Sequence, residues 1–279
     1  MTIYLRKPFK KSMRSILISF VFVSFLAACG ADDSLIEYVE RPVEEIYNEA
    51  MDRLEDGDYI YASAQFDEVE RQHPYSKWAR KAMVMSAYTY YIQNQYDQAI
   101  LTARRFVALY PGNEQAPYAY YIIAQSYYEQ ISDVERDQRN TELAQQALVE
   151  LIRRYPDSDY ARDAVLKLDL TLDHLAGKEM EVGRYYLKSG QYAAAIRRFR
   201  NVVENYERTT HVSEALHRLT EIYATLGLLD EAQNAAAILG YNYPNSDWYA
   251  DSYRILVEKE LVPQIEEKSW FSKVWNSVF

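Results

Sequence analysis

The sequence offers few residues with which a protein could perform catalysis or bind a metal. Its four histidines, His73, His174, His211 and His217, form no pair at the i, i+4 spacing with which one helix face holds a metal ion. No glycine-rich loop of the kind that holds phosphate groups occurs in the chain. The many Asp and Glu residues are explained by solvated helix surfaces. We therefore expect a protein without enzymatic activity, cofactor or metal.

Cys29 is the only cysteine among the 279 residues. It follows five basic residues, the 11-residue apolar run Ile16–Leu26 and two alanines, which is the order of regions in a signal peptide. The apolar run is too short to cross a bilayer, which takes about 20 helical residues. Leu26–Gly30 resembles the lipobox of bacterial lipoprotein precursors, in which the cysteine is lipidated and becomes the first residue. Lipidation would anchor the chain permanently, whereas the alternative is an ordinary cleaved signal followed by a buried cysteine.

The mature chain is strongly acidic. Removal of residues 1–28 takes away five of the 31 Lys and Arg residues and none of the 41 Asp and Glu residues, which leaves a formal net charge of −15. Such a surface repels phosphate backbones, so we do not expect nucleic-acid binding. By resemblance to enterobacterial lipoproteins, in which Asp after the cysteine signals retention in the inner membrane, Gly30 implies the outer membrane.

A sequence pattern typical of paired helices repeats along the chain with a basic period of 37 residues. Tyr-Pro or His-Pro marks the end of four copies, and Tyr206-Glu207 stands at the same place in a fifth. Pro74 and Pro111 are 37 residues apart, as are Glu207 and Pro244. Upstream of the marks, a Gly or Asn is expected to close a first helix in a left-handed turn, and the Pro to end the second helix.

This pattern resembles the tetratricopeptide repeat (TPR), in which pairs of antiparallel helices stack. We expect an all-α fold, a right-handed α-solenoid of about five TPR repeats with a C-terminal capping helix. The alternative is an irregular helical bundle. Small residues should fill the close contact of each helix pair, at Ala50, Ala87, Ala124, Gly183 and Thr220. The next helices should be N-capped by Ser76, Asn113, Ser158, Thr209 and Ser246.

The expected organisation has four parts, and two copies of the repeat carry insertions. The third copy should gain an ordered loop near Ser132–Gln138, and the fourth a long helix over Tyr160–Lys188. The parts are a signal peptide (1–28), a lipidated linker (29–42), a TPR domain (43–261, with units at about 43–75, 80–112, 117–157, 160–208 and 213–245 and then the capping helix) and a tail (262–279).

The third copy carries a family resemblance that a bare repeat does not. The segment that carries it is Tyr127–Gln138, which ends with Arg136, Asp137 and Gln138 of the insertion. With the lipobox and five repeats, the segment from Val43 to about Leu261 resembles the BamD family of β-barrel assembly lipoproteins. The resemblance implies a non-catalytic lipoprotein on the periplasmic face of the outer membrane. It also implies binding to BamA, to the smaller lipoproteins BamC and BamE, and to unfolded outer-membrane protein precursors.

The first helices of TPR units line the concave face, and those of the early units are rich in tyrosine. Tyrosine combines a large apolar area with a hydrogen-bonding tip, which suits the capture of an extended aromatic-rich segment. The alternative is that several of these tyrosines pack between helices. Lys81, Arg104 and Arg105 could meet a terminal carboxylate, or could lie on a solvated helix face. The predicted groove residues are Tyr47, Tyr88, Tyr91, Tyr118, Tyr121 and Tyr128.

The late units offer only weak candidates for partner binding, Arg197 and Arg218, which we choose because they lie on late helices. The aromatic residues between Trp270 and Phe279 could fold back on the protein, bind a partner or touch a membrane. Two other functions remain open at this point. One is a periplasmic TPR scaffold that recruits peptidoglycan enzymes, and the other is a structural envelope lipoprotein.

Overall fold

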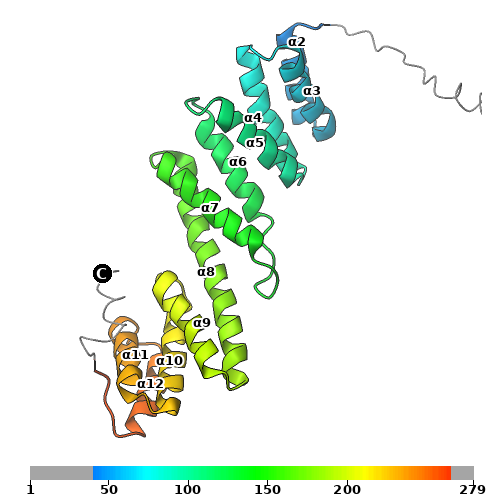
Figure 1. The fold of residues 1–279 in the computed structure, drawn as a ribbon. Helices are drawn as coiled ribbons and strands as arrows, with labels where there is room; N and C mark the ends of the chain where they lie inside the picture. Colours follow the sequence, from blue (N-terminus) through cyan, green and yellow to red (C-terminus); the bar gives the residue numbers. More distant parts are fainter. Residues whose placement is uncertain (1–39, 265–279) are drawn as a thin grey trace, which may run out of the picture. The chain divides into compact units, whose positions relative to one another are not determined.

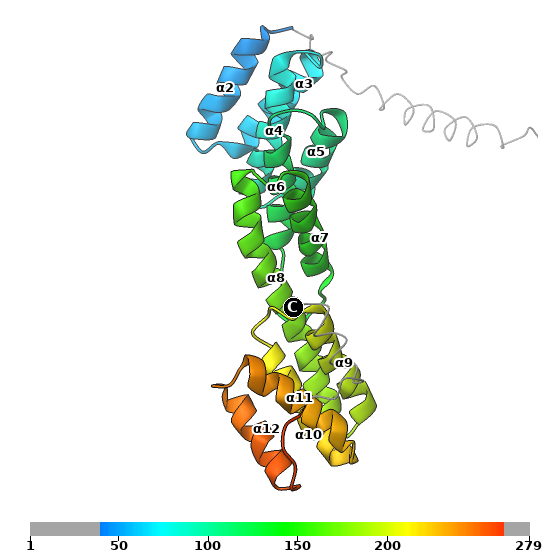
Figure 2. The same cartoon turned by 90° about the vertical axis from the view of Figure 1, so that its left-hand side faces the viewer.

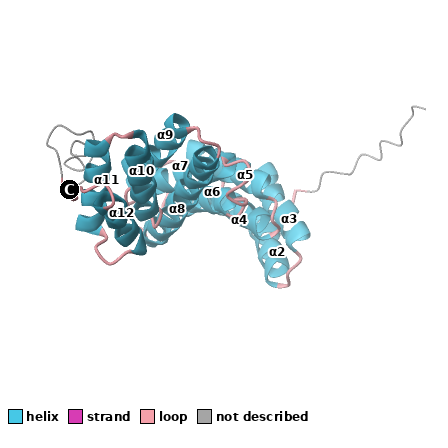
Figure 3. Cartoon of the chain, turned by 90° about the horizontal axis from the view of Figure 1, so that it is seen from below, coloured by secondary structure: helices cyan, strands magenta, loops and turns pink. Residues whose placement is uncertain are grey.

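The computed structural model describes residues 40–264, and this part of the chain is all-α. It contains eleven helices, α2 to α12, and no strand occurs among the described residues (Figure 3). Cys29 and the tail aromatics Trp270 to Phe279 lie outside the described residues, so the predictions made for them stay predictions.

The helices form pairs that stack in sequence order (Figure 1). Each helix packs against the helix before it and the helix after it, as expected for an α-solenoid. The helices are α2 (Val43–Glu55), α3 (Tyr59–Gln72), α4 (Lys77–Ile92), α5 (Tyr96–Leu109), α6 (Ala116–Tyr128), α7 (Arg139–Arg154), α8 (Asp159–Lys188), α9 (Tyr192–Asn205), α10 (Val212–Leu226), α11 (Leu229–Asn242) and α12 (Asp247–Val257).

Four of the helix pairs turn through a left-handed residue, as the sequence predicts. The φ angles are 80° at Gly57, 59° at Asn94, 71° at Gly190 and 76° at Gly227. Glycine adopts this conformation without the steric cost that a Cβ atom brings, and asparagine tolerates it better than most residues. The third pair, α6 and α7, is joined by the longer loop of residues 129–138 instead.

The predicted N-caps are correct at serine and wrong elsewhere. The Oγ atoms of Ser76, Ser158 and Ser246 accept hydrogen bonds from backbone N–H groups three residues on, at 2.9, 3.1 and 3.1 Å. Asn113 instead accepts from the N–H of Gln115 in a turn before α6, and the Thr209 hydroxyl donates to the Tyr206 carbonyl. An extra turn therefore precedes α6 and α10 and moves each helix start beyond the predicted cap.

The predicted small residues all lie in the buried contact between the two helices of a pair. The core is divided along the stack into successive clusters, each shared by neighbouring helices. Phe66, Phe106 and Phe199 are the largest side chains in it that are fully buried. Because each cluster depends on adjacent helices, distant parts of the stack can carry separate binding surfaces.

The long helix predicted over Tyr160–Lys188 is confirmed by α8, which begins after the capping Ser158 (Figure 2). Its first half contacts α6 through Tyr160, and its second half contacts α9 at Gly183 and Phe199. The predicted capping helix is α12, whose Leu256 is fully buried in the last core cluster. In the part of the chain that the structure describes, no helix has the length and apolar character needed to cross a membrane.

Candidate functional site

Four of the six predicted groove tyrosines come together on the first helices of successive pairs. The ring of Tyr88 on α4 lies 6.4 Å from that of Tyr118 on α6, measured between centroids. The ring of Tyr160 on α8 lies 5.2 Å from Tyr118 and 5.2 Å from Tyr121. We call Tyr88, Tyr91, Tyr118, Tyr121 and Tyr160 the tyrosine face. All five are partly exposed, so each presents ring surface to solvent.

Hydrogen bonds from phenol groups to carboxylates hold the tyrosine face in place. The Tyr121 hydroxyl donates to Asp163 Oδ2 at 2.7 Å, and the Tyr91 hydroxyl donates to Glu129 Oε1 at 3.3 Å. Burial and the Glu129 carboxylate raise the pKa of Tyr91 to about 12, and burial and the hydrogen bond to Asp163 raise the pKa of Tyr121. These phenols therefore stay protonated and act as donors at neutral pH.

Asp163 also accepts a hydrogen bond from Lys167 Nζ at 2.7 Å. This contact, together with the bond from Tyr121, lowers the pKa of Asp163. The Lys167 ammonium lies 5.8 Å from the ring centroid of Tyr128, the fifth predicted groove residue. Tyr128 is thus covered by a cation of its own chain, the same lysine that pairs with the Asp163 partner of Tyr121.

Tyr47, the remaining predicted groove residue, belongs to a different cluster. Its ring lies 5.6 Å from Phe66 and 4.8 Å from Trp78, so it packs among α2, α3 and α4. Tyr160 is a member of the tyrosine face that was not predicted from the sequence. A sequence pattern could have indicated it, because Trp78, Tyr160 and Trp248 each stand two residues after a capping serine.

The loop before α7 is ordered around Gln138, which is buried although its neighbours Arg136 and Asp137 are exposed. The Gln138 side-chain amide donates to the carbonyls of Asp133, Val134 and Arg136, at 3.1, 3.3 and 3.1 Å. Its oxygen accepts from the buried Thr141 hydroxyl at 2.9 Å. These bonds make the insertion a compact brace instead of a free surface loop.

The same loop is fastened to α8 and borders a hollow of about 350 Å³. Lys178 on α8 donates to the carbonyls of Glu135 and Arg136 at 2.9 and 3.3 Å. The hollow is lined by this loop, by α8 and by His211 before α10. Beside it, α8 exposes Leu166 and Leu170, which are 66% and 61% accessible. Such unpaired apolar side chains beside a hollow are a candidate contact surface for a partner.

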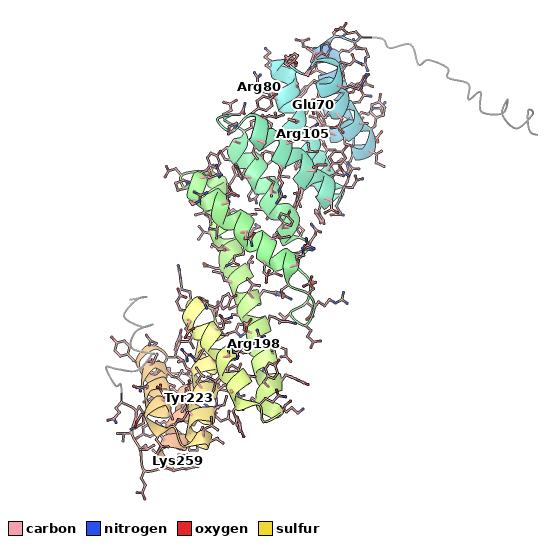
Figure 4. The ribbon with its side chains drawn as sticks, viewed as in Figure 1. Glu70, Arg80, Arg105, Arg198, Tyr223 and Lys259 are labelled. Atoms are coloured by element: carbon pink, nitrogen blue, oxygen red, sulfur yellow. The ribbon has the colours of Figure 1, made fainter. Side chains whose placement is uncertain are left out.

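The predicted partner residues Arg197 and Arg218 have different surroundings. Arg197 on α9 is exposed at the rim of a hollow of about 460 Å³, next to Arg198, which pairs with Glu179 of α8 (Figure 4). Arg218 is partly buried and pairs with Glu214 and Glu221 while its guanidinium lies 5.3 Å from the Trp248 ring centroid. Arg197 is therefore the freer of the two charges.

The three basic residues that could bind the terminal carboxylate of a peptide each contact another side chain of this chain. Arg105 of α5 pairs with Glu70 of α3, and Figure 4 shows the two labelled side by side. The Arg104 guanidinium lies 5.7 Å from the Tyr127 ring centroid, and Lys81 Nζ lies 5.5 Å from that of Trp78. Among residues 40–264 no group of three or more His, Cys, Asp or Glu side chains could hold a metal ion.

The fold and its surfaces define a helical repeat protein of the TPR class. The chain belongs to the family of outer membrane lipoproteins represented by YfiO, whose family model matches residues 39–239, and by the outer membrane protein assembly factor BamD. The BamD of Caulobacter vibrioides is 50% identical over 243 residues, which cover 86% of this chain and 80% of that protein.

Further relatives and one solved structure extend the comparison. The BamD of Rickettsia prowazekii is 44% identical over 215 residues, which cover 77% of this chain and 86% of that protein. A BamD of Neisseria meningitidis is 30% identical over 256 residues, with 87% and 96% covered. A thermophilic TPR protein from Thermus thermophilus shares 19% identity at a TM-score of 0.34, with 77% of this chain and 100% of that chain covered.

Proposed function

We propose that this chain is a non-catalytic subunit of the machinery that assembles β-barrels in the outer membrane. It binds BamA, the smaller Bam lipoproteins and unfolded outer-membrane protein precursors. The family supports the general role, since its members are assembly factors of outer membrane proteins. The tyrosine face carries the proposal for this chain, because it is a partly exposed aromatic surface suited to aromatic-rich strands.

The test of precursor binding is to replace Tyr88, Tyr91 and Tyr121 by Ala and to measure capture of a peptide with a barrel's C-terminal strand. Each aromatic anchor is expected to contribute about 1 to 3 kcal/mol if it is a binding hot spot, so the affinity should fall at least about tenfold. The matched control replaces Tyr75, Tyr185 and Tyr241, which are highly exposed and lie outside the tyrosine face.

Circular dichroism must show that both triple variants remain helical. Equal peptide affinity of the two variants, at whatever level, would remove the tyrosine face from the proposed binding site. Loss of binding in the first variant alone supports the proposal.

We also propose that Cys29 is lipidated and holds the chain on the periplasmic face of the outer membrane. The lone cysteine directly after a signal-like apolar run supports this anchor. Cys29→Ser should yield a protein that is soluble or retains its signal segment, seen by membrane fractionation and by electrophoretic mobility. A variant that stays in the outer-membrane fraction with unchanged mobility refutes the anchor.

A further inference from the structure

Glu129 stands at an unusual place beside the tyrosine face. It is exposed and forms the C-cap of α6, where the carbonyl groups at the helix end already create a partial negative charge. A carboxylate there is unfavourable, and cations are the groups normally stabilised at this end of a helix. Among the described residues the Glu129 carboxylate has no Lys, Arg or His partner, and it accepts one hydrogen bond, from the Tyr91 hydroxyl.

Two tyrosines lie near this carboxylate. Tyr91 at the end of α4 and Tyr96 at the start of α5 lie 6.0 Å apart, with their ring planes inclined at 54°. Burial and the negative charge of Glu129 raise the pKa of both phenols, and Tyr88 adds to the rise at Tyr91. Ring faces next to a carboxylate attract a cation twice, through the ring quadrupole and through the full negative charge.

Other aromatic rings of the chain already have a cation from the chain itself. Arg53 lies over Tyr61, Arg80 over Tyr110 and Arg154 over Tyr120, with 4.8, 5.9 and 5.3 Å to the ring centroids. Within the part of the chain that the structure describes, no Lys or Arg lies over Tyr88, Tyr91 or Tyr96 within the range of about 6 Å at which such contacts count. These rings and Glu129 thus lack the positive group that comparable rings have.

We infer that Glu129, Tyr91 and Tyr96 form a cation-binding site on the protein surface that receives an Arg or Lys side chain of the bound segment. The inference rests on the proposed function, because it adds a charge preference to the aromatic recognition by the tyrosine face. Asp163 does not offer the same site, since Lys167 already neutralises it. The bound segment would therefore carry a basic residue close to its aromatic residues.

The test compares three labelled peptides of the same alternating aromatic sequence that have Arg, Gln or Glu at one position. Full-length protein in detergent should bind the Arg peptide at least about fivefold more tightly than the Gln peptide at low salt, and the Glu peptide most weakly. The preference should shrink at high salt because ions screen exposed charges. In Glu129→Gln, whose side-chain oxygen can still accept the hydrogen bond from Tyr91, the Arg and Gln peptides should bind with equal affinity.

The control is Glu114→Gln, which removes the same charge near the opposite end of α6, about 20 Å away by helix rise. It should keep the Arg preference, which separates a local site from the acidity of the whole chain. Tyr96→Phe should keep the preference because the ring remains, and Tyr96→Leu should reduce it. Glu129→Gln should not lower the thermal midpoint, because it removes an anion from a helix C-terminus.

The outcomes distinguish this inference from the proposed function. If wild-type protein binds the Arg, Gln and Glu peptides equally, or if Glu129→Gln keeps the Arg preference, the cation site is refuted. The aromatic recognition would still stand, provided that all three peptides bind more tightly than a version with Ser in place of its aromatic residues. If the Ser version binds as well as the others, the recognition of aromatic-rich strands in the proposed function is wrong.

Discussion

At the scale of single residues, Gly183 allows α8 and α9 to approach closely. A Cβ atom placed on Gly183 would lie 2.5 Å from Cε1 of Phe199, a ring that is fully buried. The repeat pattern predicts a small residue here, and the structure supplies the physical reason. The ring of the second helix occupies the space that a side chain on the first helix would need.

Gly183→Ala should therefore destabilise the protein. Overpacking of a full core costs about 1 to 3 kcal/mol, and alanine recovers about 1 kcal/mol in helix propensity, so the net loss lies between about 0 and 2 kcal/mol and we expect about 1 kcal/mol. Chemical denaturation followed by circular dichroism measures it. Gly112→Ala is the control, since a Cβ atom placed on Gly112 would have no atom within 4 Å and the φ of this residue is not positive. A Gly183→Ala protein as stable as wild type contradicts the packing argument.

A second residue, His217, is expected to make the last repeat sensitive to acid. It is buried, its Nδ1 lies 2.9 Å from Ser252 Oγ of α12, and its ring lies 5.2 Å from that of Trp248. Burial lowers the pKa of His217 and Arg218 lowers it further, against the opposing effect of Glu221, Asp251 and Glu214. The proton therefore binds more readily to the unfolded chain, in which histidine titrates at about 6.5.

The stability contributed by neutral His217 should be complete above pH 6.5 and should fall as the pH drops below that value. We expect the free energy of unfolding to decrease between pH 7.5 and 5.5, and His217→Gln to lose part of this decrease. Urea titrations at both pH values provide the measurement. Identical pH dependence in the two proteins would show that His217 does not carry the effect.

At the scale of elements, the 129–138 loop depends on Gln138 for its shape. Gln138→Ala removes the donor to three carbonyls and leaves the buried Thr141 hydroxyl without its acceptor. The expected loss is about 1 to 3 kcal/mol, because buried polar groups left unpaired cost that much. Asp137→Ala, at an exposed neighbour, should stay within about 0.5 kcal/mol of wild type. Equal effects of both substitutions on the midpoint of unfolding would refute the brace.

The sequence predicted the helices better than the contacts between them. Glycine at the left-handed turns and serine at the caps are local features, so they could be read directly from the chain. Asn113 and Thr209 failed as caps because their side chains make other hydrogen bonds, Asn113 with the Gln115 N–H and Thr209 with the Tyr206 carbonyl, and the helices begin later. The contact between Glu129 and Tyr91 was not predictable, since it depends on how the end of α6 meets the end of α4.

At the scale of the whole molecule, a repeat stack can separate its binding surfaces. The tyrosine face belongs to α4, α6 and α8, whereas Arg197 lies on α9. Charge reversal at Arg197 should reduce recovery of the large barrel partner and leave peptide capture intact. Arg218→Glu should have the same effect but also disturb Trp248, so Arg197→Glu is the cleaner variant. If the tyrosine and arginine variants impair both activities equally, the division of labour along the stack is wrong.

Affinity purification of the tagged, full-length chain from detergent-solubilised membranes shows which proteins this chain assembles with. The protein belongs to a family of outer membrane lipoproteins. We predict recovery of BamA, the large barrel-forming protein, together with smaller lipoproteins. Recovery of peptidoglycan synthases without any large barrel protein would contradict the claim and favour a scaffold for cell-wall enzymes.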